Sequence, residues 1–227
     1  MTERKPTDLV IVGDSLFAEI AHEYFEFDSP YHVVAFAVED KFRTRDFFKG
    51  LPVLRFEDLE ASLDSERHSI FVAITYGLLN RTRTRLLNES MKKGFSPASY
   101  VSSKAFVWRN VTLGEHCFIF EDNTLQPFVS IGRNCILWSG NHIGHHATIE
   151  ENVFISSHVV ISGSVKIGPN CFIGVNSTIV NDIEVGGDTW IGPAVVVTRD
   201  LEGNTIWRPA RSNRREIAAR TYFKVPE

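Results

Sequence analysis

Residues 131–149 read IGRNCILWSGNHIGHHATI, and a branched aliphatic residue stands at every sixth position. The same period extends outward without a break, from Val101 to Val197, so that seventeen positions all carry Val, Leu or Ile. Neither the period of about 3.6 residues of a helix nor the simple alternation of a strand produces this pattern. A period of six predicts hexapeptide repeats, three of which form one coil of a parallel β-helix.

A second period of eighteen residues supports the coil. The segments GEHCFI, GRNCIL, EENVFI, GPNCFI and GGDTWI begin at residues 114, 132, 150, 168 and 186, and we expect them to stack as one corner of the same prism. The aliphatic residues should point inward and form a continuous core that only stacking can bury. Small residues mostly follow four positions after each aliphatic: Val111, Cys117, Val129, Cys135, Ala147, Val153 and Ser177. Asn123 and Asn141 interrupt that column eighteen residues apart, so we expect hydrogen bonds between them along the stack.

All three cysteines, Cys117, Cys135 and Cys171, fall in this inward column and are predicted to be core residues. Cys117 and Cys135 should lie about one strand spacing apart, roughly 4.8 Å. Their side chains should point in parallel, and we expect a reducing compartment. The sequence therefore predicts neither a disulfide nor a nucleophilic cysteine.

The composition is that of an ordinary globular protein. A chain of 227 residues can hold two compact units, and a net charge of −4 with 43% hydrophobic residues does not suggest a nucleic-acid partner. The charged first eight residues are not followed by an apolar signal region, and the longest apolar runs are too short to span a membrane. We expect a cytoplasmic protein without a membrane partner.

The residues before the repeats alternate between strand and helix patterns. Strands are predicted over residues 9–12, 32–38 and 69–74, and helices over about 16–25 and 81–93. This order indicates a small parallel, Rossmann-like α/β unit over residues 1–97. Ligands bind such units at the carboxyl ends of the strands. The candidate substrate-binding residues there are Gly13, Asp14, Ser15, Glu39, Asp40 and Tyr76.

The glycine pattern of this unit is weak, because the dinucleotide motif G-x-G-x-x-G is represented only by Gly13. A tight turn before a helix can bind a phosphate through its backbone amides. Equally, Gly13 could serve only to permit the turn. Both interpretations stay open from the sequence.

The repeat pattern stops after Val197, and we expect the β-helix to occupy residues 98–200 and a tail to occupy residues 201–227. The tail is rich in arginine, and a helix over about 213–222 would cap the open end of the coils. Basic side chains near the last coils could also meet the phosphates of a ligand. A solvated cap is the alternative for any one of these arginines.

Four of the eight histidines fall in one short window, as His142, His145, His146 and His158. Since Ile143 points inward, the first three should lie at or near the surface around one strand and its corner. An imidazole with a pKa of about 6.5 suits removal of a proton from a substrate at neutral pH. Metal binding is the competing use, because His142, His145 and a further histidine could supply three nitrogen ligands. Carbonic anhydrases with this coil place two histidines five residues apart, a spacing absent here, so no metal site is expected.

The hexapeptide tract joined to an α/β unit resembles the bacterial sugar acyltransferases related to the sialic acid O-acetyltransferase group. The likeness includes IVGDS at residues 11–15, the acidic pair Glu39 and Asp40, and NCFIGVNS at residues 170–177. The pattern is closest to the N-acetyltransferases that act on nucleotide-linked 4-amino sugars in bacillosamine and N-acetylperosamine synthesis. The resemblance covers nearly the whole chain.

This resemblance implies a homotrimer with a left-handed β-helix and active sites between neighbouring subunits. Acetyl-CoA would lie along the helix, and the α/β unit would hold part of a nucleotide-linked amino sugar. The catalytic histidine of the family matches His145, and the backbone amide that binds the thioester carbonyl matches Gly163. The further cofactor-binding candidates are Ser162, Gly174, Pro193 and Arg199. The acidic residue that follows the family's histidine is replaced by His146, so His142 and His146 compete for part of its role.

The predicted function is transfer of an acetyl group from acetyl-CoA to the amino group of a nucleotide-linked amino sugar, for cell-surface glycan synthesis. Both substrates should bind together, because no acylated cysteine or serine is evident. One alternative is O-acetylation of a sugar hydroxyl, a poorer acid that needs a stronger base. The others are a metal-dependent β-helix enzyme of the carbonic anhydrase type and a non-enzymatic scaffold trimer.

Overall fold

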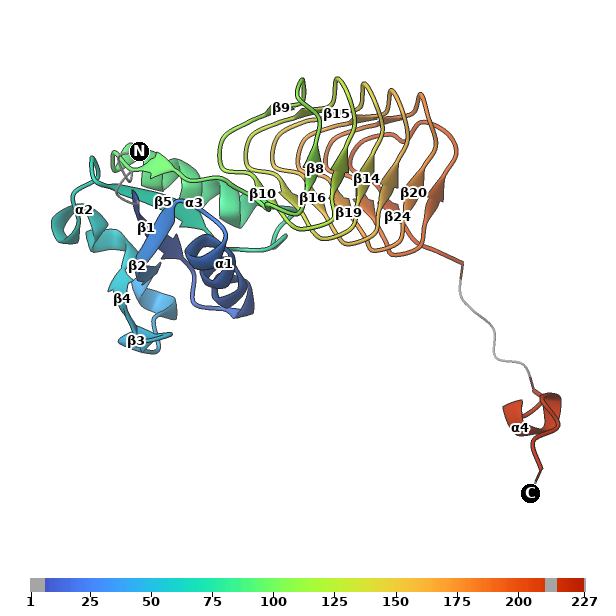
Figure 1. Ribbon diagram of the computed structural model, residues 1–227, viewed down its shortest axis with the longest axis horizontal. Coiled ribbons are helices and arrows are strands. Elements are labelled where there is room, and N and C mark those ends of the chain that lie inside the picture. Colours follow the sequence, from blue (N-terminus) through green and yellow to red (C-terminus); the bar gives the residue numbers. More distant parts are fainter. Residues whose placement is uncertain (1–6, 211–215, 227) are drawn as a thin grey trace.

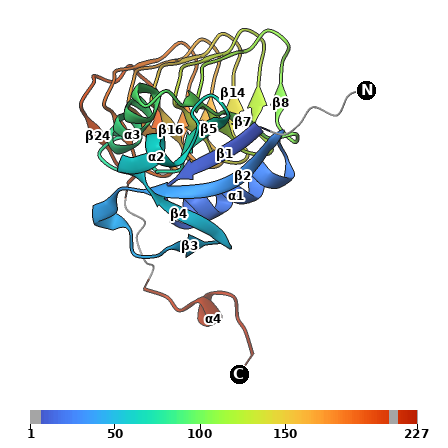
Figure 2. The same ribbon diagram turned by 90° about the vertical axis from the view of Figure 1, so that its left-hand side faces the viewer.

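The computed structural model describes residues 7–210 and 216–226. An α/β unit lies against one side of a stack of coils, as both views show (Figures 1 and 2). None of the helices among the described residues is long and apolar enough to cross a membrane.

The α/β unit is built on one six-stranded sheet with the order β3-β4-β2-β1-β5-β6, parallel except for β3. Its elements are β1 (Thr7–Val12), α1 (Leu16–Phe27), β2 (Tyr31–Val38), η1 (Asp40–Phe42), β3 (Phe47–Phe48), β4 (Leu51–Arg55), η2 (Phe56–Asp58), α2 (Leu59–Ser62), β5 (His68–Val72), α3 (Arg81–Lys92) and β6 (Ser96–Pro97). Continuous apolar runs such as residues 9–12 form its centre because both faces of a parallel sheet are buried. The predicted strands and helices are confirmed, with ends shifted by a few residues. The short elements β3, β4, β6, α2, η1 and η2 were not predicted.

The coil stack consists of two-residue strands in three parallel sheets. The first sheet contains β7 (Tyr100–Val101), β10 (Phe118–Ile119), β13 (Ile136–Leu137), β16 (Phe154–Ile155), β19 (Phe172–Ile173), β22 (Trp190–Ile191) and β24 (Ile206–Trp207). The second contains β8 (Phe106–Val107), β11 (Thr124–Leu125), β14 (His142–Ile143), β17 (Val160–Ile161), β20 (Thr178–Ile179) and β23 (Val196–Val197). The third contains β9 (Thr112–Leu113), β12 (Ser130–Ile131), β15 (Thr148–Ile149), β18 (Lys166–Ile167) and β21 (Glu184–Val185). Up to β23, partners in neighbouring coils are eighteen residues apart throughout, as predicted; Ile143, for example, pairs with Ile161.

The corners between sheets turn through a left-handed residue every six positions. Most of the non-glycine residues with positive φ occupy this position, among them Asp122, Asn134, Asn152, Asn170 and Asp182. Asn and Asp tolerate this conformation better than other non-glycine residues. Because residues at one corner recur at intervals of eighteen, their side chains form columns along the stack.

The interior of the stack is the predicted aliphatic core. Ile143 and Ile161 are fully buried, as are Cys117, Cys135 and Cys171, which are free thiols. The predicted hydrogen bond between Asn123 and Asn141, which we call the asparagine ladder, is confirmed. Asn141 Nδ2 donates to Asn123 Oδ1 at 3.0 Å. The first coil is covered less completely than the later ones. Val101 and Leu113 are each 36% exposed, because no earlier coil lies above them.

The α/β unit covers the outer face of the first sheet. Phe17 and Tyr24 of α1 pack against Phe118 and Phe120, and Phe120 stacks on Trp138 with ring centroids 4.4 Å apart. One continuous apolar cluster therefore includes both α1 and the first sheet.

A buried cation joins α3 to the coils beside this cluster. Arg83 is 1% exposed and donates to the carbonyl oxygens of Val72, His116 and Asn134. The Val72 N–H donates to His116 Nε2 at 2.9 Å, so the ring proton of neutral His116 lies on Nδ1, 2.8 Å from Asn134 Oδ1. These bonds satisfy a charged group that would otherwise be costly to bury.

The far end of the stack is closed by the chain between Leu201 and Trp207. Leu201 is 4% exposed, and Trp207 packs against the aliphatic core. The predicted capping helix over 213–222 is partly outside the described residues. Within them, α4 (Ala219–Tyr222) is a single turn whose residues are all exposed, so it does not cap the coils as predicted.

Candidate active site

The strongest candidate site lies at one corner of the stack, between the second and third sheets. We define the histidine corner by Gln126, Phe128, His145, His146 and Gly163. These residues follow β11, β14 and β17, three successive strands of the second sheet. The coil register therefore brings together residues that are up to 37 positions apart in the sequence.

The His145 backbone is fixed by the coils on either side. Its N–H donates to Gln126 Oε1 at 2.9 Å, and its carbonyl oxygen accepts from the Ser164 N–H at 2.9 Å. The His145 ring lies directly against Gly163, where an added Cβ would be 2.6 Å from the ring Cε1 atom. Only glycine at position 163 leaves room for the imidazole in this place.

The His146 ring is held by a column of the corner. His146 has a φ of 59° and Phe128, eighteen residues earlier, has a φ of 66°, so both occupy the left-handed corner position. Their rings stack with centroids 4.6 Å apart and an interplanar angle of 23°. The Nδ1 atoms of His145 and His146 are 3.1 Å apart, within hydrogen-bonding distance.

The other two histidines of the window lie elsewhere. His142 is on β14, on the outer face of the second sheet, where it pairs with Thr124 and Val160 in neighbouring strands. Its half-buried ring makes no hydrogen bond to another residue in the described parts of the chain. His158 lies against Gly140 at the corner between the first and second sheets. The structure therefore forms a pair of histidines rather than a cluster of four.

The predicted cofactor-binding residues are divided between two corners. Ser162 and Gly163 are at the histidine corner, and the Gly163 N–H donates no hydrogen bond to any described residue. Arg199 lies at the same corner at the end of the stack, with its guanidinium 5.6 Å from the Trp207 ring centroid. Gly174 and Pro193 lie at the corner between the first and second sheets. Both corners border the second sheet, so a ligand along this sheet could reach all five.

The α/β unit has a cavity of about 170 Å³ at the carboxyl ends of its strands. Gly13, Asp14, Ser15 and Glu39 line it, as predicted for a ligand crevice. Asp14 forms an ion pair with Arg45 at 3.2 Å, and Glu39 forms one with Arg85 at 2.9 Å. Two of the carboxylates that line the crevice are therefore each paired with an arginine.

Asp40 and Tyr76 are not among the residues that line this cavity. Asp40 forms an ion pair with Arg55 at 3.1 Å. Tyr76 packs on Phe154 and Phe172 of the coils, so it contributes to the junction between the two units.

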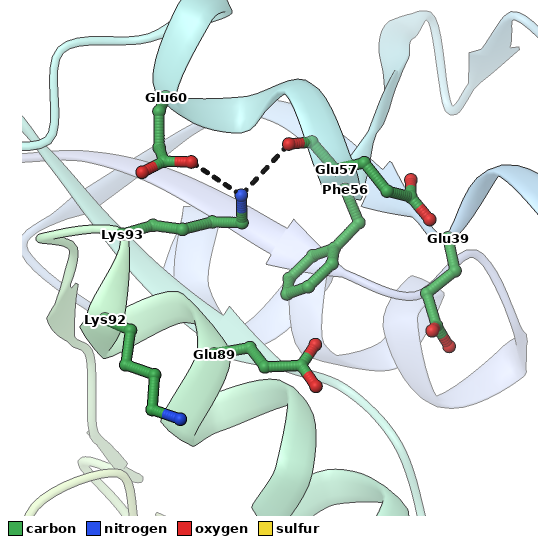
Figure 3. A pocket seen from close by; sticks show the side chains of 7 residues that line it. All are labelled: Glu39, Phe56, Glu57, Glu60, Glu89, Lys92 and Lys93. Atoms are coloured by element: carbon green, nitrogen blue, oxygen red, sulfur yellow. Dashed lines mark hydrogen bonds and ion pairs between the residues drawn. The ribbon is translucent and has the colours of Figure 1, made fainter.

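A second hollow, of about 410 Å³, adjoins the crevice through Glu39 (Figure 3). Lys93 Nζ reaches across it to the Glu60 carboxylate at 2.7 Å and to the Glu57 carbonyl oxygen at 3.0 Å. The Glu89 carboxylate accepts from Arg85 at 3.1 Å. These acidic groups are already paired within the protein.

The crevice and the histidine corner of one chain lie on opposite sides of the coil prism. The α/β unit covers the first sheet, and the histidine corner joins the second and third sheets, across the prism from it. One chain therefore does not bring its own crevice to its own His145.

No group of three or more His, Cys, Asp or Glu side chains within residues 7–210 and 216–226 is arranged to hold a metal ion. Of the three candidate ligands, His142 lies on the flat face of the second sheet, whereas His145 and His146 lie together at its corner. Gln126 and Phe128 were missed by the sequence analysis. Their spacing of eighteen or nineteen residues from His145 and His146 is the signal that could have identified them.

Comparison with known proteins agrees with this architecture. A family model described as bacterial transferase hexapeptide (six repeats) matches residues 146–181. Perosamine N-acetyltransferase from Caulobacter crescentus, solved as a histidine-to-asparagine variant with CoA and GDP-perosamine, is 25% identical, with a TM-score of 0.79 over 88% of this chain and 92% of that chain. This chain resembles the hexapeptide-repeat sugar acyltransferases, in particular the amino-sugar N-acetyltransferases.

Two further solved structures share the fold at lower identity. The acetyltransferase domain of PglB from Neisseria gonorrhoeae is 21% identical, with a TM-score of 0.79 over 88% of this chain and 95% of that chain. WeeI from Acinetobacter baumannii is 19% identical, with a TM-score of 0.75 over 87% of this chain and 94% of that chain. A comparison with curated protein sequences found no match.

Proposed function

We propose that this protein transfers an acetyl group from acetyl-CoA to the amino group of a nucleotide-linked amino sugar. The observation that carries the proposal is the His145 ring, which lies on Gly163 beside a backbone N–H that donates to no described residue. The perosamine N-acetyltransferase, which shares both units of the fold, was solved with CoA and a nucleotide-linked amino sugar. A general base and an amide donor side by side suit acyl transfer to an amine.

In this mechanism the uncharged sugar amine attacks the thioester carbonyl carbon, and His145 Nε2 accepts a proton from the nitrogen. The Gly163 N–H donates to the carbonyl oxygen as negative charge develops there. Collapse of the tetrahedral intermediate breaks the carbon–sulfur bond and forms the amide. The protonated His145 then returns its proton to the CoA thiolate, which leaves the imidazole neutral for the next cycle.

The nucleotide is proposed to bind in the crevice of the α/β unit, with its phosphates near Gly13, Asp14 and Ser15 at the start of α1. The N-terminal end of a helix favours anions. Acetyl-CoA is proposed to lie along the second sheet, between the corners of Gly163 and Gly174.

We further propose a homotrimer with left-handed coils, in which the α/β unit of one copy meets the histidine corner of another. The opposite placement of crevice and corner within one chain supports this arrangement. The outer face of the second sheet also exposes Phe106 at 51% and Val196 at 64%, as expected of a surface that another copy covers.

The function is tested by incubating the purified protein with acetyl-CoA and a panel of nucleotide-linked sugars, with CoA release and product mass as readouts. We expect acetylation of an amino sugar, and a loss of kcat of about 10²–10⁴-fold in His145→Ala with little change in KM. Acetylation of sugars that carry only hydroxyl groups would favour O-acetylation instead. No transfer to any sugar would contradict the proposal.

The shared site is tested by co-expressing two inactive variants. His145→Ala removes the base, and Ser15→Glu places a negative charge where a phosphate should bind, at a helix start that tolerates an acidic residue. If each site combines two copies, mixed assemblies regain about a quarter of the normal number of intact sites. If each chain forms its own site, mixing restores no activity.

A further inference from the structure

We propose that His146 is a positioning residue that sets the tautomer of His145 by accepting a hydrogen bond as a neutral imidazole. The kinetic consequences of this inference rest on the proposed function. The inference says how a histidine can orient His145 from a position where the family resemblance implies an acidic residue. The argument begins from the contact of 3.1 Å between the two Nδ1 atoms.

Two imidazole nitrogens at this distance need one proton between them. A neutral imidazole has one N–H donor and one acceptor nitrogen. If the proton were on His146 Nδ1, His145 Nδ1 would accept the hydrogen bond. The ring proton of His145 would then lie on Nε2, which would leave that nitrogen without a free lone pair. In the opposite arrangement, His145 Nδ1–H donates to His146 Nδ1, and His145 Nε2 carries a free lone pair.

Only the second arrangement leaves neutral His145 with a free lone pair for a proton of the substrate. Because His145 Nδ1 is engaged with His146 Nδ1, Nε2 is the ring nitrogen that remains to accept that proton. The His146 proton is then on Nε2, the tautomer that a free imidazole in water prefers. The pair therefore assigns the less common tautomer to His145 and the more common one to His146.

Phe128 holds the acceptor in place. Its ring stacks on His146, and the Phe128 N–H donates to Asn110 Oδ1 at 3.0 Å, so the corner residue above His146 is itself fixed. The His145 and His146 planes are 84° apart, which directs the edge of one ring toward the other. The stacking on Phe128 thus limits rotation of the His146 ring.

The chain itself supplies well-matched substitutions. Asn and Asp carry Oδ1 the same number of bonds from Cα as the Nδ1 atom of histidine. Asn152, Asp182 and Ala194 already adopt the φ of the corner position, between 56° and 61°. His146→Asn therefore keeps an acceptor, His146→Asp adds a charged acceptor, and His146→Ala removes the acceptor, all in a backbone conformation that these residue types adopt elsewhere in the stack.

The first test is spectroscopic and does not depend on turnover. Nitrogen-15 NMR of the histidine side chains, at a pH where both rings are neutral, should show His145 as the Nδ1–H tautomer. In His146→Ala the His145 signals should shift to the Nε2–H form, and in His146→Asn they should stay. His158→Ala, which alters an exposed histidine at another corner, should leave the His145 signals unchanged.

The second test is kinetic. A neutral hydrogen bond contributes about 1 kcal/mol, so His146→Ala should lower kcat about fivefold with KM unchanged, while His146→Asn should retain most of the activity. His146→Asp should match or exceed the unaltered protein, because a carboxylate also stabilises the imidazolium. Since His146 acts only through His145, adding His146→Ala to His145→Ala should cause no further loss.

The inference is overturned by an Nε2–H tautomer for His145 in the unaltered protein, or by equal loss of kcat in the Asn and Ala variants. Additive losses in the double variant would likewise assign His146 a role of its own. If no amino sugar is acetylated by the unaltered protein, the proposed function fails, and the NMR result still decides the hydrogen bond between the two histidines.

Discussion

The substitution Gly163→Ala perturbs the proposed site by a single methyl group and leaves every proposed chemical group in the protein. The new Cβ would lie 2.6 Å from Cε1, 2.9 Å from Nε2 and 3.1 Å from Nδ1 of His145. Gly163 is not among the residues with a left-handed backbone, so alanine can adopt its conformation without strain. The consequence is therefore displacement of the His145 ring.

The size of this displacement follows from the contact distances. Ordinary van der Waals contact begins at 3.4 Å, so the ring has to retreat by roughly 0.8 Å from a Cβ that would lie at 2.6 Å. Misplacement of a catalytic group by about 1 Å can cost about 10²-fold in rate. We expect kcat to fall by about 10²-fold with little change in either KM. The free energy of unfolding should change by less than about 1 kcal/mol, because the exposed ring can rotate outward.

The assay measures CoA release at saturating substrates, together with thermal unfolding of both proteins. Gly140→Ala is the matched control, since its Cβ would lie 2.6 Å from Nδ1 of His158. With a φ of +76°, this control should lose stability but keep its kcat. If Gly163→Ala shows a displaced His145 ring in a crystal structure and normal kcat, His145 is not the base.

Burial and, secondly, the Arg83 guanidinium hold the pKa of His116 well below its ordinary value of 6.5. As the pH falls, the unfolded chain binds a proton at this histidine that the folded chain does not. Stability should therefore be highest above about pH 6.5 and decline as the pH falls below it. Thermal unfolding of the protein and of His116→Gln between pH 5 and 8 should show that the variant lacks this part of the pH dependence. Asn141→Leu should lower the free energy of unfolding by about 1–3 kcal/mol in urea titrations. The substitution leaves Asn123 Oδ1 and the buried Val159 N–H without the partners that Asn141 provides. An unchanged urea midpoint would show that the asparagine ladder adds nothing to stability. Burial raises the pKa of Cys171 to about 11, and the pKa values of Cys117 and Cys135 are also raised. These thiols stay protonated at neutral pH, so each Cys→Ala variant should keep its turnover. Each variant should lose about 1 kcal/mol of stability, because a buried side chain is shortened. A folded variant without acyl transfer would reopen a covalent mechanism.

The histidine corner shows how far spacing alone could predict a site. The interval of eighteen residues predicts that positions 128 and 146 stack, and the inward Ile143 predicts that His145 and His146 reach the surface. The contact between the two Nδ1 atoms and the place of Gly163 beneath the ring depend on rotamers and on the height of each coil, which spacing does not specify. For the same reason, three histidines within five residues appeared as one cluster in the sequence but lie on a corner and a flat face in the structure.

The α/β unit was less predictable than the coils. Its central strands could be recognised from apolar runs, and Gly13, Asp14, Ser15 and Glu39 do line a crevice. Tyr76 was placed in the same group because it follows β5, but its ring packs on the coils. The end of a strand determines where the following loop begins. The direction of that loop depends on its tertiary contacts.

The sequence by itself determined the coil, its register and its core, because each hexapeptide repeats the same local geometry and buries the same aliphatic position against its neighbours. It also identified the buried thiols and the asparagine ladder, which follow from the same period. Tertiary structure alone decided that the α/β unit covers the first sheet and that the histidine corner lies across the prism from it. That arrangement depends on contacts such as those of Arg83 and Phe17, made between segments that share no period, so no spacing in the sequence could predict it.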